Sequence, residues 1–339
     1  MILVTGGLGF IGAHTAVTLL DNDFEVLIVD DLSNTSIDVL DGIKKTCGKR
    51  PHFEQIDLKD KAKVTQLFET YTIKGIIHFA AYKAVGESVE KPLAYYDNNL
   101  SSLINLLEVA GYQERRIPFI FSSSCTVYGE PDHLPITENE PSKTALSPYG
   151  NTKQICEEIL SDLTKVNANI PVIALRYFNP IGAHTSAEIG ELPLGVPQNL
   201  VPFITQSAAG IRGPITIFGD DYPTKDGTCI RDYIHVVDLA DAHVVALKHL
   251  NNLSNSTAFN VLNVGTGKGT SVLEIVQAFE RVTNVSLGYA IGERREGDVV
   301  ETFADTTKIN NTLGWQASKT LDDALLSAWN WEKKLRGIS

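Results

Sequence analysis

The sequence predicts an α/β fold, in which a doubly wound parallel sheet is followed by a smaller C-terminal α+β domain. Short apolar runs alternate with longer helical patterns through the first half of the 339-residue chain, which is typical of βαβ units. These runs are β-branched and almost wholly apolar, as strands covered on both faces should be. After about residue 178 the alternation stops and proline and glycine become frequent, which indicates a change of architecture.

The expected elements follow from these patterns along the chain. The strands lie at 2–4, 26–29, 76–79, 119–121 and 172–175, and the helices at 12–21, 60–70, 92–110 and 148–166. We expect residues 1–178 to form the first domain and residues 179–339 the second. The run 235–250 has a helical pattern, and we expect the segment near 231–262 to return to the first domain.

The composition argues against several classes of partner. Asp and Glu outnumber Lys and Arg by 41 to 29, and an acidic chain with a net charge of −12 suits neither nucleic acid nor an anionic membrane. The four cysteines are scattered and form no C-x-x-C pair, so we expect reduced thiols in a cytoplasmic protein and no metal site. Residues 1–20 carry no charged side chain, but glycines interrupt them and no basic stretch precedes them, which favours a strand, a turn and a helix over a signal peptide.

A glycine-rich turn lies between the first expected strand and the first expected helix. Gly6, Gly9 and Gly12 form the pattern G-x-x-G-x-x-G, in which glycine permits a sharp turn and lets the backbone approach a pyrophosphate at the helix N-terminus. Asp30 ends the next strand, where a carboxylate can accept hydrogen bonds from both ribose hydroxyls and repels a 2′-phosphate. The sequence therefore predicts a Rossmann-type domain that binds NAD in preference to NADP.

Two further strand ends belong with this predicted site. Asp57 and Leu58 should follow the third strand, where a carboxylate can reach the adenine amine, although a helix N-cap or a loop carboxylate explains Asp57 equally well. Phe79, Ala80 and Ala81 end the fourth strand, and the small alanines let a cofactor lie close to the backbone.

Three residues indicate what is done with the cofactor. Tyr149 and Lys153 are four residues apart in an expected helix, so both side chains lie on one face of it. A free phenol has a pKa of about 10, and a nearby ammonium should lower that pKa towards a value useful for a base at neutral pH. Y-x-x-x-K alone also fits a surface pair, but Ser124 at the end of a strand can present a hydroxyl to the same substrate oxygen. We therefore expect a proton to leave a sugar-type alcohol while a hydride passes to nicotinamide.

Eight motifs extend along nearly the whole chain. They are Thr5–Gly12, His78–Ser88, Tyr95–Asn99, Ser122–Gly129, Ser147–Gly150, Arg176–Pro180, Arg231–His235 and Arg295–Asp298. In these motifs the chain resembles the UDP-galactose 4-epimerases (UDP-glucose 4-epimerases), a family of the extended short-chain dehydrogenase/reductase superfamily. The resemblance implies an isomerase that inverts C4 of a UDP-hexose through a 4-keto sugar, with a tightly bound NAD that is regenerated in each cycle. It also implies a homodimer built from two long helices of each subunit.

The resemblance further implies which residues bind each ligand. The implied catalytic residues are Tyr149, as the base, with Ser124 and Lys153. The implied NAD site comprises Gly6, Gly9, Phe10, Ile11, Gly12, Asp30, Asp31, Leu32, Ser33, Asn34, Thr35, Asp57, Leu58, Phe79, Ala80, Ala81, Lys83, Asn98, Ser124, Tyr149, Lys153, Tyr177 and Phe178. The implied UDP-sugar site comprises Ser124, Tyr149, Asn179, Asn199, Leu200, Thr216, Ile217, Phe218, Arg231, Arg295, Asp298 and Thr302.

The implied substrate residues make chemical sense, although each has a plainer explanation. Arg231 and Arg295 carry guanidinium groups that match phosphate oxygens, and Phe218 could cover a uracil ring. Arg231 could equally form an ion pair with the adjacent Asp232, and Phe218 could be part of the core.

One departure from the family concerns the size of the sugar site. Thr302 stands where family members often have tyrosine, and the smaller side chain should leave more room beside the hexose. We therefore hypothesise some turnover of UDP-N-acetylhexosamines, with a UDP-N-acetylglucosamine 4-epimerase as the alternative reading.

Other reactions on the same fold stay open to different degrees. A nucleotide-sugar 4,6-dehydratase typically needs an Asp-Glu pair after the catalytic Ser or Thr, and here those positions are Cys125 and Thr126. A decarboxylase acting on UDP-glucuronate is a further alternative. A non-catalytic NAD-sensing protein would have no need of Ser124, Tyr149 and Lys153 together.

Overall fold

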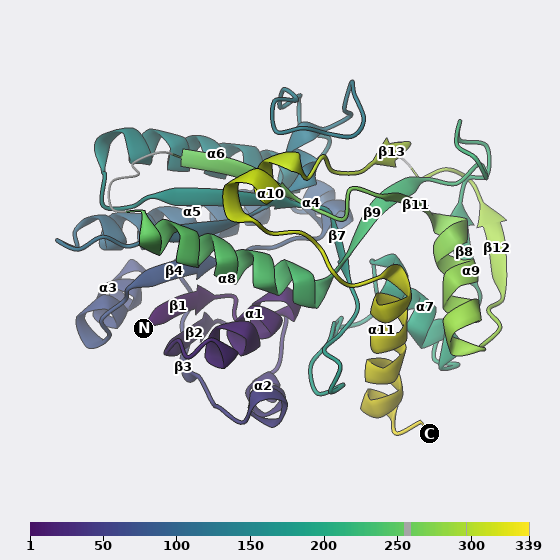
Figure 1. The fold of residues 1–339 in the computed structure, drawn as a ribbon, viewed down its shortest axis with the longest axis horizontal. Coiled ribbons are helices and arrows are strands. Elements are labelled where there is room, and N and C mark those ends of the chain that lie inside the picture. Colours follow the sequence, from purple (N-terminus) through teal and green to yellow (C-terminus); the bar gives the residue numbers. More distant parts are fainter. Residues whose placement is uncertain (254–258, 296, 339) are drawn as a thin grey trace.

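The computed structural model describes residues 1–253, 259–295 and 297–338. Its centre is a parallel sheet of seven strands in the order β10-β6-β5-β4-β1-β2-β3, and every neighbouring pair is parallel (Figure 1). The prediction of a doubly wound parallel sheet is confirmed. The strands are β1 (Ile2–Thr5), β2 (Val26–Asp30), β3 (His52–Gln55), β4 (Gly75–His78), β5 (Phe119–Ser124), β6 (Val172–Tyr177) and β10 (Phe259–Val264).

The direction of winding changes between β1 and β4. From β1 the chain proceeds outward through β2 and β3, and it then returns to β4 on the other side of β1. In open α/β sheets, ligands bind outside the carboxyl ends of the strands at such a switch point. The hydroxyl of Thr5 and Nδ1 of His78 lie 2.7 Å apart and link the two strands there.

Helices cover both faces of this sheet because successive strand residues point to opposite sides. On one face Val4, Ile28 and Ile77 pack with apolar residues of α1 and α8. On the other face Leu3 and Phe119 pack with α3, α5 and α6. The helices of the two layers are α1 (Phe10–Asp21), α2 (Val39–Cys47), α3 (Lys61–Thr70), α5 (Pro92–Gly111), α6 (Pro148–Val166) and α8 (Val236–Asn252).

The remaining elements form a second, smaller layer at one end of the sheet (Figure 1). A short sheet with the order β11-β9-β13, to which β7 adds alongside β9, and a pair of strands, β8 with β12, pack with three helices around their own apolar core. These elements are β7 (Asn179–Ile181), α7 (Leu200–Ala208), β8 (Ile215–Phe218), β9 (Ile230–His235), β11 (Gly269–Ser271), α9 (Val272–Thr283), β12 (Tyr289–Gly292), β13 (Glu301–Thr302) and α11 (Leu321–Arg336).

Between these smaller elements the chain passes back to the large sheet. Helix α8 packs against α1, β10 adds to the sheet beside β6, and α10 (Thr307–Leu313) packs on β10 and α8. The helices α2, α4 (Val85–Glu90) and η1 (Cys125–Tyr128) were not anticipated from the sequence; α4 and η1 are too brief to show a clear apolar period. No helix in the described part of the chain is long and apolar enough to cross a membrane.

Candidate active site

The glycine turn connects β1 to α1 at the switch point of the sheet. Gly6 has a φ of 64°, and a Cβ there would lie 2.7 Å from the backbone nitrogen of Ala80. A Cβ on Gly12 would overlap the carbonyl oxygen of Gly6. Gly9 is the N-cap of α1, and no side chain caps this helix. The N-terminal N–H groups of α1 therefore have no side-chain partner. They lie beside a backbone turn that only glycine permits, and together these two features make a suitable site for a pyrophosphate.

The Asp30 carboxylate holds two segments of this site together. One oxygen accepts a hydrogen bond from Leu8 N at 3.1 Å, and the other accepts one from Leu32 N at 3.0 Å. Burial raises the pKa of Asp30, while these two backbone donors oppose the rise. The Thr35 hydroxyl donates to Leu8 O at 2.7 Å, so that the 31–35 segment closes over the turn. Each oxygen of Asp30 keeps a lone pair that can accept from a ribose hydroxyl.

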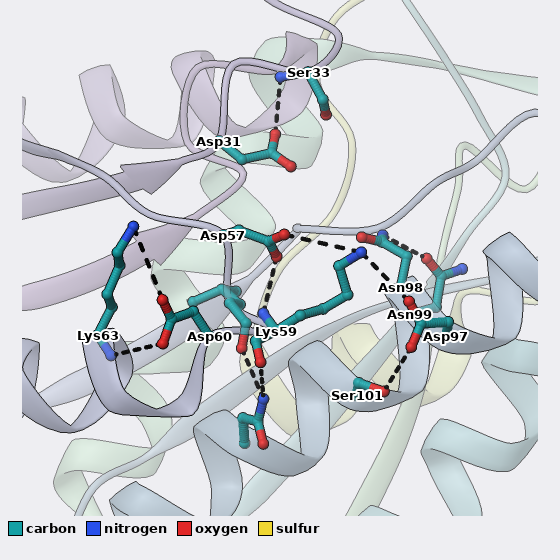
Figure 2. A network of polar contacts seen from close by, with 12 residues as sticks. Asp31, Ser33, Asp57, Lys59, Asp60, Lys63, Asp97, Asn98, Asn99 and Ser101 are labelled. Atoms are coloured by element: carbon teal, nitrogen blue, oxygen red, sulfur yellow. Dashed lines mark hydrogen bonds and ion pairs between the residues drawn. The ribbon is translucent and has the colours of Figure 1, made fainter.

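A polar network joins the segment after β3 to α5 (Figure 2). The Lys59 ammonium lies 3.8 Å from Oδ2 of Asp57 and 3.3 Å from Oδ2 of Asp97, next to the buried Asn98. Asp60 is the N-cap of α3 and accepts from Lys63 N. Asp57 is therefore not the N-cap of α3 but a loop carboxylate, which accepts from Lys59 N at 2.9 Å and lies near the Lys59 ammonium. Its assignment to the NAD site stays a prediction.

The residues that follow the fourth strand make different kinds of contact. Phe79 packs on His243 with ring centres 4.7 Å apart, and Ala80 and Ala81 are half-buried. The Lys83 ammonium lies 3.5 Å from a carboxylate oxygen of Glu191, which belongs to the second layer.

Two of the predicted cofactor residues, Leu58 and Phe178, are buried by packing, and a third, Tyr177, is partly buried. The Phe178 ring belongs to an apolar cluster with Val127 and Tyr128, and Leu58 packs under the opposite face of the sheet. Tyr177 forms a hydrogen bond with Ser122. The side chains of Phe178 and Leu58 are buried within these apolar clusters. Any contact that these residues make with a ligand is therefore through their backbone atoms.

Ser124, Tyr149 and Lys153 all lie at the carboxyl end of β5. The Ser147 hydroxyl accepts from Gly150 N at 3.1 Å and caps α6, which places Tyr149 in the first turn and Lys153 one turn later. The Ser124 oxygen accepts from the N–H and the hydroxyl of Thr126, at 3.2 and 3.0 Å. All three predicted catalytic side chains are buried, with exposures of 7%, 7% and 4%. Because the sheet is parallel, the carboxyl end of β5 lies on the same edge of the sheet as the glycine turn after β1, with β4 between the two strands.

The electrostatics of this cluster differ from the expectation. Burial raises the pKa of Tyr149, with a further contribution from Tyr177, and the interaction with Ser124 opposes the rise. Burial also lowers the pKa of Lys153 to about 8. The Lys153 ammonium donates to Ser122 O at 2.7 Å and lies 5.9 Å from the centre of the Tyr149 ring. In the protein alone, burial therefore keeps the phenol neutral despite the nearby Lys153, and a further positive charge beside the phenol would favour its ionised form.

The predicted substrate residues form a second cluster on β8, β9 and the segment before β13. Arg295 donates to both carboxylate oxygens of Asp298, at 3.1 and 2.8 Å, and its guanidinium lies 5.6 Å from the centre of the Phe218 ring. Arg231 lies 3.6 Å from the same carboxylate. Phe218 is 44% exposed, so the explanation as a core residue is wrong. Glu296, within the same motif, lies outside the described residues.

Asp232 binds backbone N–H groups. Its carboxylate accepts from the N–H groups of Thr266, Gly267 and Ala304, and it forms no ion pair with Arg231. The plainer explanation of an Arg231–Asp232 pair is therefore wrong.

The other predicted substrate residues differ in their burial and in their partners. Thr302 is buried and lies beside Arg231 in the register of β13 and β9. Asn199 precedes α7, which Leu200 begins, and donates to Glu191 at 2.6 Å instead of capping its own helix. Thr216 is exposed, whereas Ile217 packs in the core of the second layer and can contribute only backbone atoms. Asn179 starts β7 and is half-buried.

The two clusters are joined through the segment that follows Ser124. Ala304, two residues after Thr302, packs against Val127 and Tyr128 of η1. Ile136 N donates to Phe303 O at 2.9 Å. These contacts bring the ends of β5 and β13 to one junction between the layers.

Several residues of this region were missed from the sequence. Glu191 contacts Lys83 and Asn199, and no local pattern marks it. Glu157, by contrast, lies four residues after Lys153 on α6, so helical spacing could have found it. No cluster of His, Cys, Asp or Glu that could hold a metal ion occurs among the described residues.

Comparison with known proteins gives a consistent result. A family model described as GDP-mannose 4,6 dehydratase matches residues 3–327. The UDP-glucose 4-epimerase of Bacillus subtilis (strain 168) is 48% identical over 332 residues, covering 98% of this chain and 96% of the relative. The structure of the UDP-glucose-4-epimerase from Stenotrophomonas maltophila, with bound NAD and formylated UDP-arabinopyranose, superposes with a TM-score of 0.94 at 44% identity and covers 100% of this chain and 99% of that one. That of the enzyme from Bifidobacterium longum, in complex with NAD+ and UDP, has a TM-score of 0.94 at 43% identity, with the same coverage.

Proposed function

Because this chain belongs to the UDP-glucose 4-epimerase family, we propose that it interconverts UDP-galactose and UDP-glucose by reversible oxidation at C4 with a retained NAD. The observation that carries the proposal is the convergence of Ser124, Tyr149 and Lys153 at the carboxyl end of β5, on the same edge of the parallel sheet as the glycine turn. In this proposal, NAD binds to residues 1–178 and the UDP-sugar binds mainly to residues 179–339.

The residues at the switch point fit an NAD molecule. Gly6, Gly9 and Gly12 would hold the pyrophosphate, and Asp30 would hold the adenosine ribose and repel a 2′-phosphate. When bound, NAD would supply a reversible acceptor for the hydride of C4. Its positively charged ring would also provide a further positive charge that favours the ionised form of the buried Tyr149 phenol.

Protein side chains carry out the proton transfer. Tyr149 takes the proton of the C4 hydroxyl, directly or through Ser124, and returns it when the sugar has turned over. The Ser124 oxygen accepts from the N–H and the hydroxyl of Thr126, so its own hydrogen can be donated towards the phenol. In a relay through Ser124, the sugar hydroxyl would take the place of one of these two Thr126 donors. Lys153 stabilises the phenolate by its charge.

The nucleotide is held by the second cluster while the hexose stays free to turn. A diphosphate can replace the Asp298 carboxylate as the partner of Arg231 and Arg295, since guanidinium groups bind phosphate oxygens in the same bidentate way. Phe218 offers an exposed ring for uracil, and the uncapped N-terminus of α7 offers N–H donors for a phosphate.

Incubation of the purified protein with UDP-galactose tests this function. The expected product is UDP-glucose, formed without accumulation of NADH. A 4-keto-6-deoxy sugar would instead indicate a dehydratase, which the structure disfavours because burial raises the pKa of the Cys125 thiol to about 12 and leaves it a poor acid–base group. Release of CO₂ from UDP-glucuronate would indicate a decarboxylase.

Thr302 favours a second substrate class, the UDP-N-acetylhexosamines. Its small side chain stands beside Arg231 at the end of β13, where a tyrosine would fill the space next to the sugar. We expect slow conversion of UDP-N-acetylglucosamine by the natural protein and its loss in Thr302→Tyr, with UDP-galactose conversion retained. Absence of product from UDP-N-acetylglucosamine at high protein concentration would reject this extension.

We also propose that the protein is a cytoplasmic homodimer. Leu93 at the start of α5 is 81% exposed, and Val89 in the preceding helix is 61% exposed, so both apolar side chains are available to a second copy. Helices α5 and α6 pack side by side on one face of the sheet and offer a surface for a second copy. Light scattering should show a dimer that Leu93→Arg converts to a monomer, while Val196→Asp, at a loop position that is 61% exposed, should leave it intact. A monomeric wild-type protein would refute the proposal.

A further inference from the structure

A buried ion pair lies behind the catalytic cluster. Glu157 follows Lys153 by one turn on α6, and Arg176 on β6 donates to its carboxylate through Nε at 2.9 Å and through Nη2. The Ser123 hydroxyl also donates to this carboxylate. Both charged side chains are 8% exposed. Burying such a pair costs desolvation energy that its attraction often fails to recover, so its presence here calls for another reason than stability.

The surroundings of Lys153 supply that reason. Cys156 and Glu157 on α6, His78 on β4 and the Tyr149 phenol are the titratable groups of the described chain that act on the Lys153 ammonium or lie against it. Burial raises the pKa of Cys156 to about 12 and lowers that of His78 to about 3, so both are neutral near pH 7. The phenol is neutral as well, because burial raises its pKa. Glu157 is thus the one negative charge among these groups.

We propose that Glu157 is a positioning residue, whose carboxylate keeps the Lys153 ammonium charged beside Tyr149 and which Arg176 holds in that place. The inference rests on the proposed reaction, in which Lys153 acts through its charge. The Glu157 carboxylate also has a second role. By accepting a hydrogen bond from the Ser123 hydroxyl it fixes the end of β5, where Ser124 is the next residue.

The test is the titration of Lys153 in the NAD-loaded protein. The protein is labelled with [ε-¹³C]lysine, and the Lys153 resonance is identified by its loss in Lys153→Met. Glu157→Gln removes the negative charge and leaves Arg176 unpaired, so the midpoint of the Lys153 titration should fall by about one pH unit. At the wild-type midpoint, that fall reduces the protonated fraction from a half to about a tenth, and kcat/KM should drop about fivefold as its alkaline limb moves to lower pH.

Three variants separate charge from structure. Ser123→Ala removes a hydrogen bond to the same carboxylate but no charge, and both the midpoint and the alkaline limb should stay at the wild-type values. Glu157→Asp should restore most of the midpoint. If Glu157→Gln does not fold, the double variant Glu157→Gln/Arg176→Met, which leaves no unpaired charge, should show a smaller fall in the same direction.

The outcomes are distinct. An unchanged Lys153 midpoint in Glu157→Gln or in the double variant overturns the inference, as does an equal fall in Ser123→Ala. Absence of epimerase activity in the wild type overturns the proposed function instead, and the resonance titration still decides whether Glu157 sets the charge of Lys153.

Discussion

Replacing Lys153 by methionine should make the nucleotide-free protein more stable while removing its activity. The fold lowers the pKa of Lys153 from 10.5 to about 8, mainly by burial. At about 1.4 kcal/mol per pH unit, keeping the buried ammonium charged costs about 3 kcal/mol. Methionine keeps most of the volume and removes this cost, but it leaves the Ser122 carbonyl without its 2.7 Å donor, which costs about 1–2 kcal/mol. The net expectation is a gain of about 1–2 kcal/mol in the free energy of unfolding at pH 7.

The sign of this effect sets its pH dependence. Between pH 8 and 10.5 the unfolded state binds the Lys153 proton and the folded state does not, so the wild-type protein gains stability as the pH rises through this window. Below pH 8 both states are protonated and the full cost is present. The advantage of Lys153→Met should therefore be constant below pH 8 and fade between pH 8 and 10.5.

Urea unfolding measures this directly. Nucleotide is removed from both proteins by gel filtration in urea, the chains are refolded, and the unfolding midpoints are compared from pH 7 to 10. A Lys153→Met protein that is less stable at pH 7, with a difference from wild type that does not vary with pH, would refute the reasoning that burial controls this ammonium.

Three further predictions concern the same site. Tyr149→Phe should keep its NAD and lose turnover by a factor on the order of 100 to 10,000, because the proton acceptor is gone; steady-state assays beside a count of released nucleotide check both parts. Gly12→Ala should lose bound NAD, since its Cβ would overlap the Gly6 carbonyl, whereas Gly213→Ala, whose Cβ would meet nothing within 4 Å, should retain it; equal nucleotide content would contradict the close-packed turn. Asp30→Asn replaces a carboxylate that accepts from two backbone N–H groups, and titration calorimetry should show NAD binding weakened by at least about tenfold, because hydrogen bonds to a charged acceptor contribute about 1.5–3 kcal/mol.

Local patterns explain what could be read from the sequence. The glycine turn, the strand before it and Asp30 lie within one βαβ unit, so their spacing fixes their relation in space. Tyr149 and Lys153 share a helix face for the same reason. These features required no knowledge of the packing of distant segments.

Properties that arise from packing could not be read in this way. The direction of the Tyr149 pKa depends on how completely neighbouring elements exclude water, and α6, β5 and β6 all contribute to that burial. The partner of Arg231 proved to be Asp298, far along the chain, and not the adjacent Asp232. The Glu157–Arg176 pair joins a helix to a strand, and only the assembled sheet brings the two together.

The most direct measurement follows a deuterium atom placed at C4 of UDP-galactose. If the hydride passes to a retained NAD and returns within the same active site, the UDP-glucose formed carries the deuterium at C4 and no NADH accumulates. Exchange of the label for solvent hydrogen, or no formation of UDP-glucose, would contradict the proposal that this protein inverts C4 by reversible oxidation.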